Sequence, residues 1–319
     1  MEGAAEVSGV LGILERLDRR WVFLAMALAV AGPILVMGLT RKTLPETPTD
    51  ASRAVFRAVQ SLPQGSTVLL AFDFDPGSAG ELEPMGVNMA RHCALRGHKM
   101  VFISLWPLGG QMIDQTIEKV IRADFPQLQD GVDFVNLGFQ AGNEQVMRVV
   151  LTDFKRAFPT TKSGRATADL PILQGVQRIG DFALLASVSA GYPGSKEWVQ
   201  YVVSASGGKL PMVSGCTGVQ TPQLYPYFPG QISGLLGAIK GAAEYESLIN
   251  AWVMDPANAA EWSGRGAASG APMVLPPKYL EAQRRMGPQL GAHLLMVVLI
   301  LLGNLVYFAQ RRAQRRVAA

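Results

Sequence analysis

The sequence has little of the material from which disulfide scaffolds, zinc sites and common catalytic motifs are built. Its 319 residues include two cysteines, Cys93 and Cys216, which are too few for a disulfide scaffold and leave their pairing open. His92 and His98 lack the spacing of zinc ligands, and the third histidine, His293, lies in a long apolar run. No Gly-x-Ser-x-Gly elbow is present, and no dinucleotide fingerprint follows the first expected strand.

Charged side chains are also scarce, at 17% of the chain against about a quarter in a typical soluble protein. The net charge of +4 equals the four arginines among the last nine residues, so the remainder is balanced. A nucleic-acid-binding protein needs a basic face on its folded domain, and this balance therefore argues against one. We expect the basic tail, over 311–319, to contact anionic lipid head groups instead.

Two long uncharged runs account for the scarcity of charge. They are WVFLAMALAVAGPILVMGLT at 21–40 and MGPQLGAHLLMVVLILLGNLVYFAQ at 286–310. A helix of about 20 apolar residues covers a hydrocarbon core of roughly 30 Å, so both runs predict transmembrane helices. The first run exceeds the apolar core of a signal peptide and no clear cleavage site follows it, which favours a retained anchor.

The short tails determine the predicted orientation, because a long domain crosses a membrane whatever its charge. Arginines precede the first run and follow the second, so we expect both tails in the cytoplasm and the intervening domain outside it. The other predicted parts are a tail over 1–20 that is either an interfacial helix or disordered, an α/β domain over 41–254, and a linker and membrane-proximal segment over 255–285.

Small residues in the first run indicate that the anchors contact other helices. Ala25, Ala29 and Gly32 form a stripe that lets helix backbones pack closely in lipid, and Asn304 in the second run offers an interhelical hydrogen bond. The contact would join the two anchors of one chain or anchors of different chains, and the alternative is a stripe that faces lipid. The expected partners are the bilayer and either another membrane protein or a second copy of the chain.

Between the anchors, short runs that are apolar on both alternating positions are followed by helical patterns. We predict strands at 67–74, 99–106, 132–139, 181–189 and 210–217, and helices at 84–96, 111–123, 143–157, 195–206 and 230–250. The last helix would carry a ridge of glycines at 230, 234, 237 and 241. This alternation predicts an α/β fold: an open, mostly parallel sheet of about five strands with helices on both faces.

In an open parallel sheet, ligands bind outside the carboxyl ends of the strands, and here each expected strand leads into a loop that contains glycine. Backbone N–H groups in such loops can approach a ligand closely, although strand-to-helix turns, helix caps and packing explain the same residues. The candidate ligand-binding residues are Ser104, Gly110, Gly194, Ser195, Lys196, Thr217, Tyr225 and Tyr227.

Asp73 and Asp75 follow the first apolar run as Asp-x-Asp, and paired carboxylates at a strand end can hold Mg²⁺. The pattern resembles the first motif of haloacid-dehalogenase-like phosphatases, which implies a nucleophile at Asp73 and a general acid/base at Asp75. VFIS, ending at Ser104, is similar to the second motif of that family, which holds a phosphate oxygen. The sequence departs from the family pattern at Pro76-Gly77, and no lysine is placed for the third motif. The other interpretation is a turn whose acids cap the following helix.

These observations lead to two functional hypotheses. The first is a membrane-anchored α/β domain that binds a ligand or partner within a membrane assembly. The second is a metal-assisted hydrolase of phosphorylated or acidic substrates that uses Asp73, Asp75 and Mg²⁺. Whether the chain is an enzyme stays open at this point.

Overall fold

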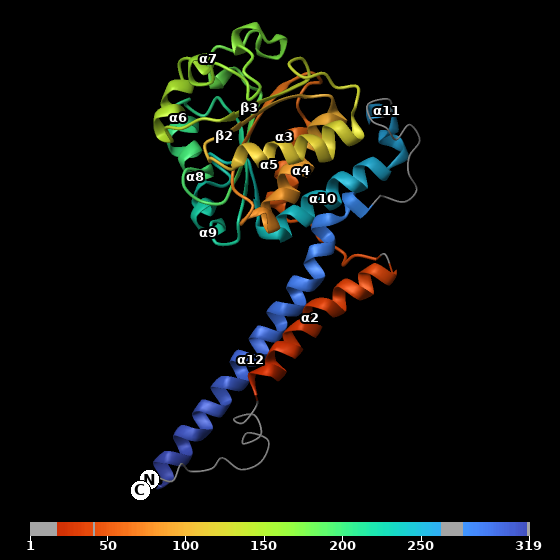
Figure 1. The fold of residues 1–319 in the computed structure, drawn as a ribbon, viewed down its shortest axis with the longest axis vertical. Helices are drawn as coiled ribbons and strands as arrows, with labels where there is room; N and C mark the ends of the chain where they lie inside the picture. Colours follow the sequence, from red (N-terminus) through yellow and green to blue (C-terminus); the bar gives the residue numbers. More distant parts are fainter. Residues whose placement is uncertain (1–17, 41, 263–276, 318–319) are drawn as a thin grey trace. The chain divides into compact units, whose positions relative to one another are not determined.

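The computed structural model describes residues 18–40, 42–262 and 277–317, which form two compact units (Figure 1). The larger unit runs from Pro45 to Gln283. The smaller unit consists of the described residues up to Leu44 and from Arg284 onward. The predicted tail over 1–20 therefore falls almost entirely outside the described residues, as does 263–276 of the predicted linker.

A parallel sheet forms the centre of the larger unit. In the described residues it has six strands in the order β3-β2-β1-β4-β5-β6, and each neighbouring pair is parallel. This arrangement confirms the predicted α/β fold and adds one strand to the expected five. The strands are β1 Thr67–Asp73, β2 Lys99–Ser104, β3 Phe134–Phe139, β4 Leu184–Ser189, β5 Met212–Cys216 and β6 Gly234–Gly237.

Helices cover both faces of this sheet. Side chains along a strand alternate between the two faces, and these strands are apolar on both, so both faces need cover. Phe72 in β1 points to the face where α4 packs so closely that a Cβ on Gly86 would lie 2.7 Å from the Phe72 ring. Leu69 and Ala71 in the same strand join the core of the opposite face, together with Trp198. The helices are α3 Asp50–Gln60, α4 Ala79–Arg96, α5 Gly109–Thr116, α6 Glu144–Val150, α7 Phe154–Ala157, α8 Ser195–Glu197, α9 Thr221–Leu224, α10 Ala238–Met254 and α11 Ala259–Trp262.

Two helices continue into π-helical segments, α5 into η1 (Ile117–Arg122) and α8 into η5 (Trp198–Val203). Single 3-10 turns, including η2 Thr167–Asp169, η3 Pro171–Leu173, η4 Ile179–Asp181 and η6 Tyr225–Tyr227, fill the connections. Cys93 and Cys216 are both free and buried, so they do not pair. Burial raises the pKa of Cys93 to about 12 and that of Cys216 to about 11.

The prediction of one helix over 230–250 is wrong in its first third. Gly234–Gly237 forms the edge strand β6, and α10 begins only at Ala238. The glycines are required because other backbone lies against this strand: a Cβ on Gly234 would be 2.4 Å from the backbone nitrogen of Val55 in α3. Close approach is therefore the reason for glycine on the strand at Gly234, and also on α10 at Gly241, where a Cβ would lie 2.8 Å from the backbone of Leu236.

The smaller unit contains α2 (Arg19–Thr40) and most of α12 (Glu281–Val317), two helices that are long and apolar enough to cross a membrane. They touch through glycines of α12, since a Cβ on Gly291 would lie 2.3 Å from the carbonyl oxygen of Ala29 and one on Gly287 would meet Met37 at 3.0 Å. Of the predicted stripe, Gly32 faces open space. Asn304 is exposed, and its side chain makes no hydrogen bond within the described residues.

Candidate functional site

The carboxyl ends of the strands meet at one edge of the sheet, which we call the carboxyl edge. Strand order runs outward from β1 to β3 and then returns to the other side of β1 with β4. This reversal is the topological switch point at which open α/β sheets bind their ligands. Asp73 and Ser189 end the two central strands and lie opposite each other in register.

Asp73 is fully buried at this point and connects three elements. Its Oδ1 accepts the backbone N–H of Leu105, at 2.7 Å, and its Oδ2 accepts the indole N–H of Trp198, at 2.8 Å. Burial raises the pKa of Asp73 to about 7, and the two hydrogen bonds oppose this rise. Both oxygens thus join β1 to the end of β2 and to η5, and neither is exposed for a substrate or a metal ion.

Asp75, the second acid of the Asp-x-Asp pattern, lies in a different environment from Asp73. It is partly exposed, and its Oδ1 accepts the backbone N–H of Ser78 at 3.2 Å, in the turn that leads into α4. Ser104, the counterpart of the second phosphatase motif, is buried and bonds the backbone N–H and C=O of Trp106, each at 3.0 Å. Among the described residues, no group of three or more His, Cys, Asp or Glu side chains is placed to hold a metal ion.

The glycines of the carboxyl edge are packed against their own neighbours. A Cβ on Gly109, at the start of α5, would lie 2.0 Å from Ser104 Oγ, and one on Gly194 would lie 2.7 Å from Ser189 Cβ. Gly110 is buried, and a Cβ on it would lie 3.9 Å from the backbone nitrogen of Phe139, an ordinary contact distance. The glycines therefore allow tight packing of loops on the strand ends.

Ser195 belongs to a buried group of hydroxyls that sequence reasoning missed as a group. Its Oγ lies 2.7 Å from Ser214 Oγ, 2.9 Å from Ser187 Oγ and 3.0 Å from Ser189 Oγ. The hydroxyls satisfy one another and attach α8 to β4 and β5, so the group is a structural network. The sequence signal for this network was the presence of Ser187, Ser189 and Ser214 inside strand runs that are otherwise apolar. Lys196, next to Ser195, is half-exposed and has no ion pair within the described residues.

The aromatic residues predicted as a wall separate into two environments. Tyr225 is exposed, whereas Tyr227 is half-buried and its hydroxyl accepts a hydrogen bond from Gln200 Nε2 at 2.8 Å. Thr217 is half-buried, and its carbonyl oxygen accepts the hydroxyl of Thr221 at 2.9 Å.

The carboxyl edge also exposes large apolar and aromatic side chains. The last residue of β3 and the loops that follow β2, β4 and β5 each present at least one large exposed side chain of this kind, and Val219 reaches 84% exposure. These side chains, which we call the rim residues, are Leu108, Phe139, Tyr192, Val219 and Tyr225. Their loops are braced from beneath: Trp106 donates its indole N–H to the carbonyl of Pro193 at 2.7 Å, and Tyr192 donates to Glu144.

Comparison with protein-family models, with curated proteins and with solved structures finds no match to this chain. Its function has to follow from the geometry of the site.

Proposed function

We propose that the chain is a membrane-anchored component of a membrane assembly, in which the α/β domain binds a partner protein through its rim residues. In this proposal α2 and α12 span the bilayer, both tails lie in the cytoplasm, and the α/β domain lies on the other side.

The anchors are supported by exposed apolar surface. In the most apolar 18-residue stretch of each helix, only 6% of the residues of α2 and 0% of those of α12 are buried within the protein. A core helix of a soluble domain would bury most of such a window, because apolar surface gains about 25 cal/mol for each Å² removed from water. A bilayer supplies that burial. The arginines that flank the two helices on their tail sides support the orientation.

The observation that carries the partner proposal is the concentration of exposed apolar side chains on one edge. Elsewhere in the described part of the α/β unit, the exposed large apolar side chains are Val132 and Met254. Exposed apolar side chains gathered on one part of a domain favour an interaction surface, and aromatic residues such as the two rim tyrosines are enriched in protein interfaces.

A partner protein fits this edge better than a small polar ligand does. A small ligand needs a few polar groups that are free to orient it. Here the carboxylate of Asp73, the hydroxyl of Ser104 and the hydroxyl group around Ser195 are already satisfied within the domain. The same observation removes support from the hydrolase hypothesis, since a nucleophile or magnesium ligand must face its substrate.

The test begins with the full chain purified from membranes in mild detergent, and with identification of the proteins that co-elute. Val219→Glu places a charge on the rim, and Val132→Glu is the matched control at the opposite, amino end of β3. We expect the rim variant to lose the partner and the control to retain it. Retention by Val219→Glu and by Tyr225→Glu would contradict the partner surface. Recovery of the chain in the supernatant after centrifugation without detergent would contradict the anchors.

A further inference from the structure

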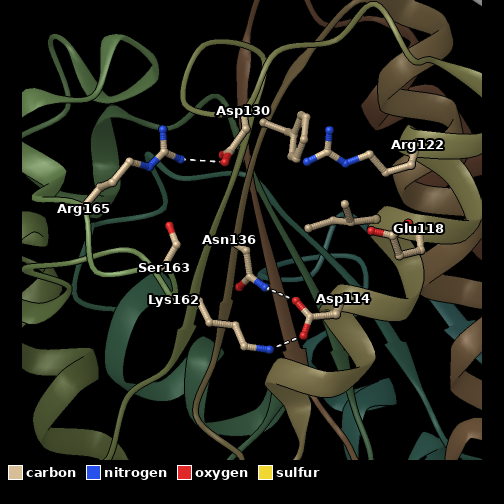
Figure 2. A pocket seen from close by; sticks show the side chains of 10 residues that line it. Asp114, Glu118, Arg122, Asp130, Asn136, Lys162, Ser163 and Arg165 are labelled. Carbon is tan, nitrogen blue, oxygen red and sulfur yellow. Dashed lines mark hydrogen bonds and ion pairs between the residues drawn. The ribbon is translucent and has the colours of Figure 1, made fainter.

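A hollow of about 390 Å³ lies beside β3, and none of the rim residues lines it (Figure 2). Three separate segments form its walls: the end of α5 with η1, the strand β3 with the turn before it, and the polar connection over 158–171. The volume is within the range of about 300–1,000 Å³ that is typical of small-molecule sites.

Two ion pairs hold the walls in place. Lys162 pairs with Asp114, which also accepts a hydrogen bond from Asn136 Nδ2 at 2.8 Å. On the other side, Arg165 Nη2 lies 2.7 Å from Asp130 Oδ2. Figure 2 marks both pairs, Lys162 with Asp114 and Arg165 with Asp130, by dashed lines. The pairs neutralise four of the charged groups, which are then not available to attract a separate ion.

Two charged side chains of the lining have no such partner. Glu118 and Arg122 lie one turn apart on η1, and neither makes an ion pair or side-chain hydrogen bond within the described residues. The guanidinium carbon of Arg122 is 5.5 Å from the centre of the Phe134 ring, and this contact holds the group over the wall of the hollow. The helix that carries both residues is π-helical here, a rare conformation that is frequent at functional sites.

We propose that this hollow binds a small zwitterion of the amino-acid or dipeptide class. The guanidinium of Arg122 would take the ligand carboxylate, for which its planar fork is suited, and the carboxylate of Glu118 would take the ammonium group. The lining contains three acids and three bases, so its formal charges cancel. A neutral but dipolar ligand matches this balance, whereas a multiply charged anion such as phosphate would meet as many acids as bases. The site is independent of the rim.

The experiment is calorimetric titration of the full chain in detergent with the standard amino acids and the dipeptide Ala-Ala, one at a time. Each ligand that binds is compared with its matched fragments, for example alanine with propionate and with ethylamine, and with inorganic phosphate. A charged hydrogen bond is worth about 1.5–3 kcal/mol, so the zwitterion should bind at least about tenfold more tightly than either fragment.

Variants then assign the two groups. Arg122→Gln and Glu118→Gln should each weaken binding by about tenfold or more. Arg148→Gln is the matched control, because Arg148 also lies over an aromatic ring, that of Tyr201 at 5.2 Å, but outside the hollow. If Arg122→Gln does not fold, Glu118→Gln decides the question, since this side chain is exposed and makes no ion pair or hydrogen bond within the described residues. The proposal is overturned if no amino acid or dipeptide binds, if propionate or phosphate binds as tightly, or if Glu118→Gln leaves the affinity unchanged.

Discussion

The variant Asp73→Asn tests whether the buried carboxylate at the switch point is a structural link that burial destabilises. Asparagine keeps the shape of the side chain but offers one acceptor oxygen where the carboxylate offers two. One of the two donors, the Leu105 N–H or the Trp198 indole, would then lose its acceptor inside the protein. An unsatisfied buried donor costs about 1–3 kcal/mol. Against this cost, the variant removes a buried charge.

The pH dependence shows which effect is larger. The pKa of Asp73 is about 7 in the folded protein, chiefly because of burial, and an aspartate in an unfolded chain has a pKa of about 3.9. The folded state therefore holds the proton more tightly, so this contribution to stability is complete below about pH 4 and is lost as the pH rises to about 7. At 1.36 kcal/mol for each pKa unit, the loss is about 4 kcal/mol.

The two magnitudes predict a change of sign. At about pH 8 the charge costs about 4 kcal/mol and the lost acceptor about 1–3 kcal/mol, so Asp73→Asn should be the more stable protein. At about pH 4 the carboxyl group is neutral, and the variant should be equally stable or less stable than the wild type.

Urea unfolding of the full chain in detergent measures this difference, with tryptophan fluorescence as the signal, because Trp198 bonds Asp73 directly. Taking the difference between wild type and variant at each pH cancels the other titrating groups. Asp169→Asn, at an exposed aspartate, is the control. A wild-type-minus-variant difference that stays constant from about pH 4 to about pH 8 would refute the raised pKa and with it the structural interpretation of this carboxylate.

Three further predictions follow, two from closely packed glycines and one from a hydrogen-bonded carboxylate. Gly234→Ala should lower the free energy of unfolding by about 1–3 kcal/mol, because its methyl group would overlap the backbone of α3, whereas Gly80→Ala faces open space and should not; equal urea midpoints would contradict this. Gly291→Leu should separate α12 from α2 and Gly303→Leu should not, as measured by cross-linking of cysteines introduced into both helices. Glu244 lies in α10. Burial would raise its pKa, but hydrogen bonds from Lys240, Ser52 and Thr49 hold the pKa below its usual value. Its stabilisation is therefore lost as the pH falls below about 4, and Glu244→Gln should cost about 1–3 kcal/mol in urea unfolding at about pH 7.

The layered fold was predictable because its main strands carry their own signal. The runs over 67–74 and 99–106 are short and apolar on both faces, as strands of a sheet covered on two sides are. The strand β6 carries no such signal, since Gly-Leu-Leu-Gly holds two apolar residues between glycines at helical spacing. Its identity depends on the backbone of α3 lying against Gly234, a contact between segments far apart in the sequence. A local pattern cannot contain that information.

The position of the carboxyl edge could be predicted from the sequence, but the state of its polar groups could not. The residue types at Asp73 and Ser195 suggest reactivity, yet the groups that satisfy them come from other strands and helices. Folding uses the polar groups of this edge and leaves apolar side chains such as Val219 in solvent. Leaving large apolar side chains exposed gains nothing for the isolated domain, because burial of apolar surface is what stabilises a fold. An edge whose buried polar groups are satisfied and whose large apolar side chains are exposed is suited to contact with another protein surface, and it is poorly suited to the chemistry that its acids first suggest.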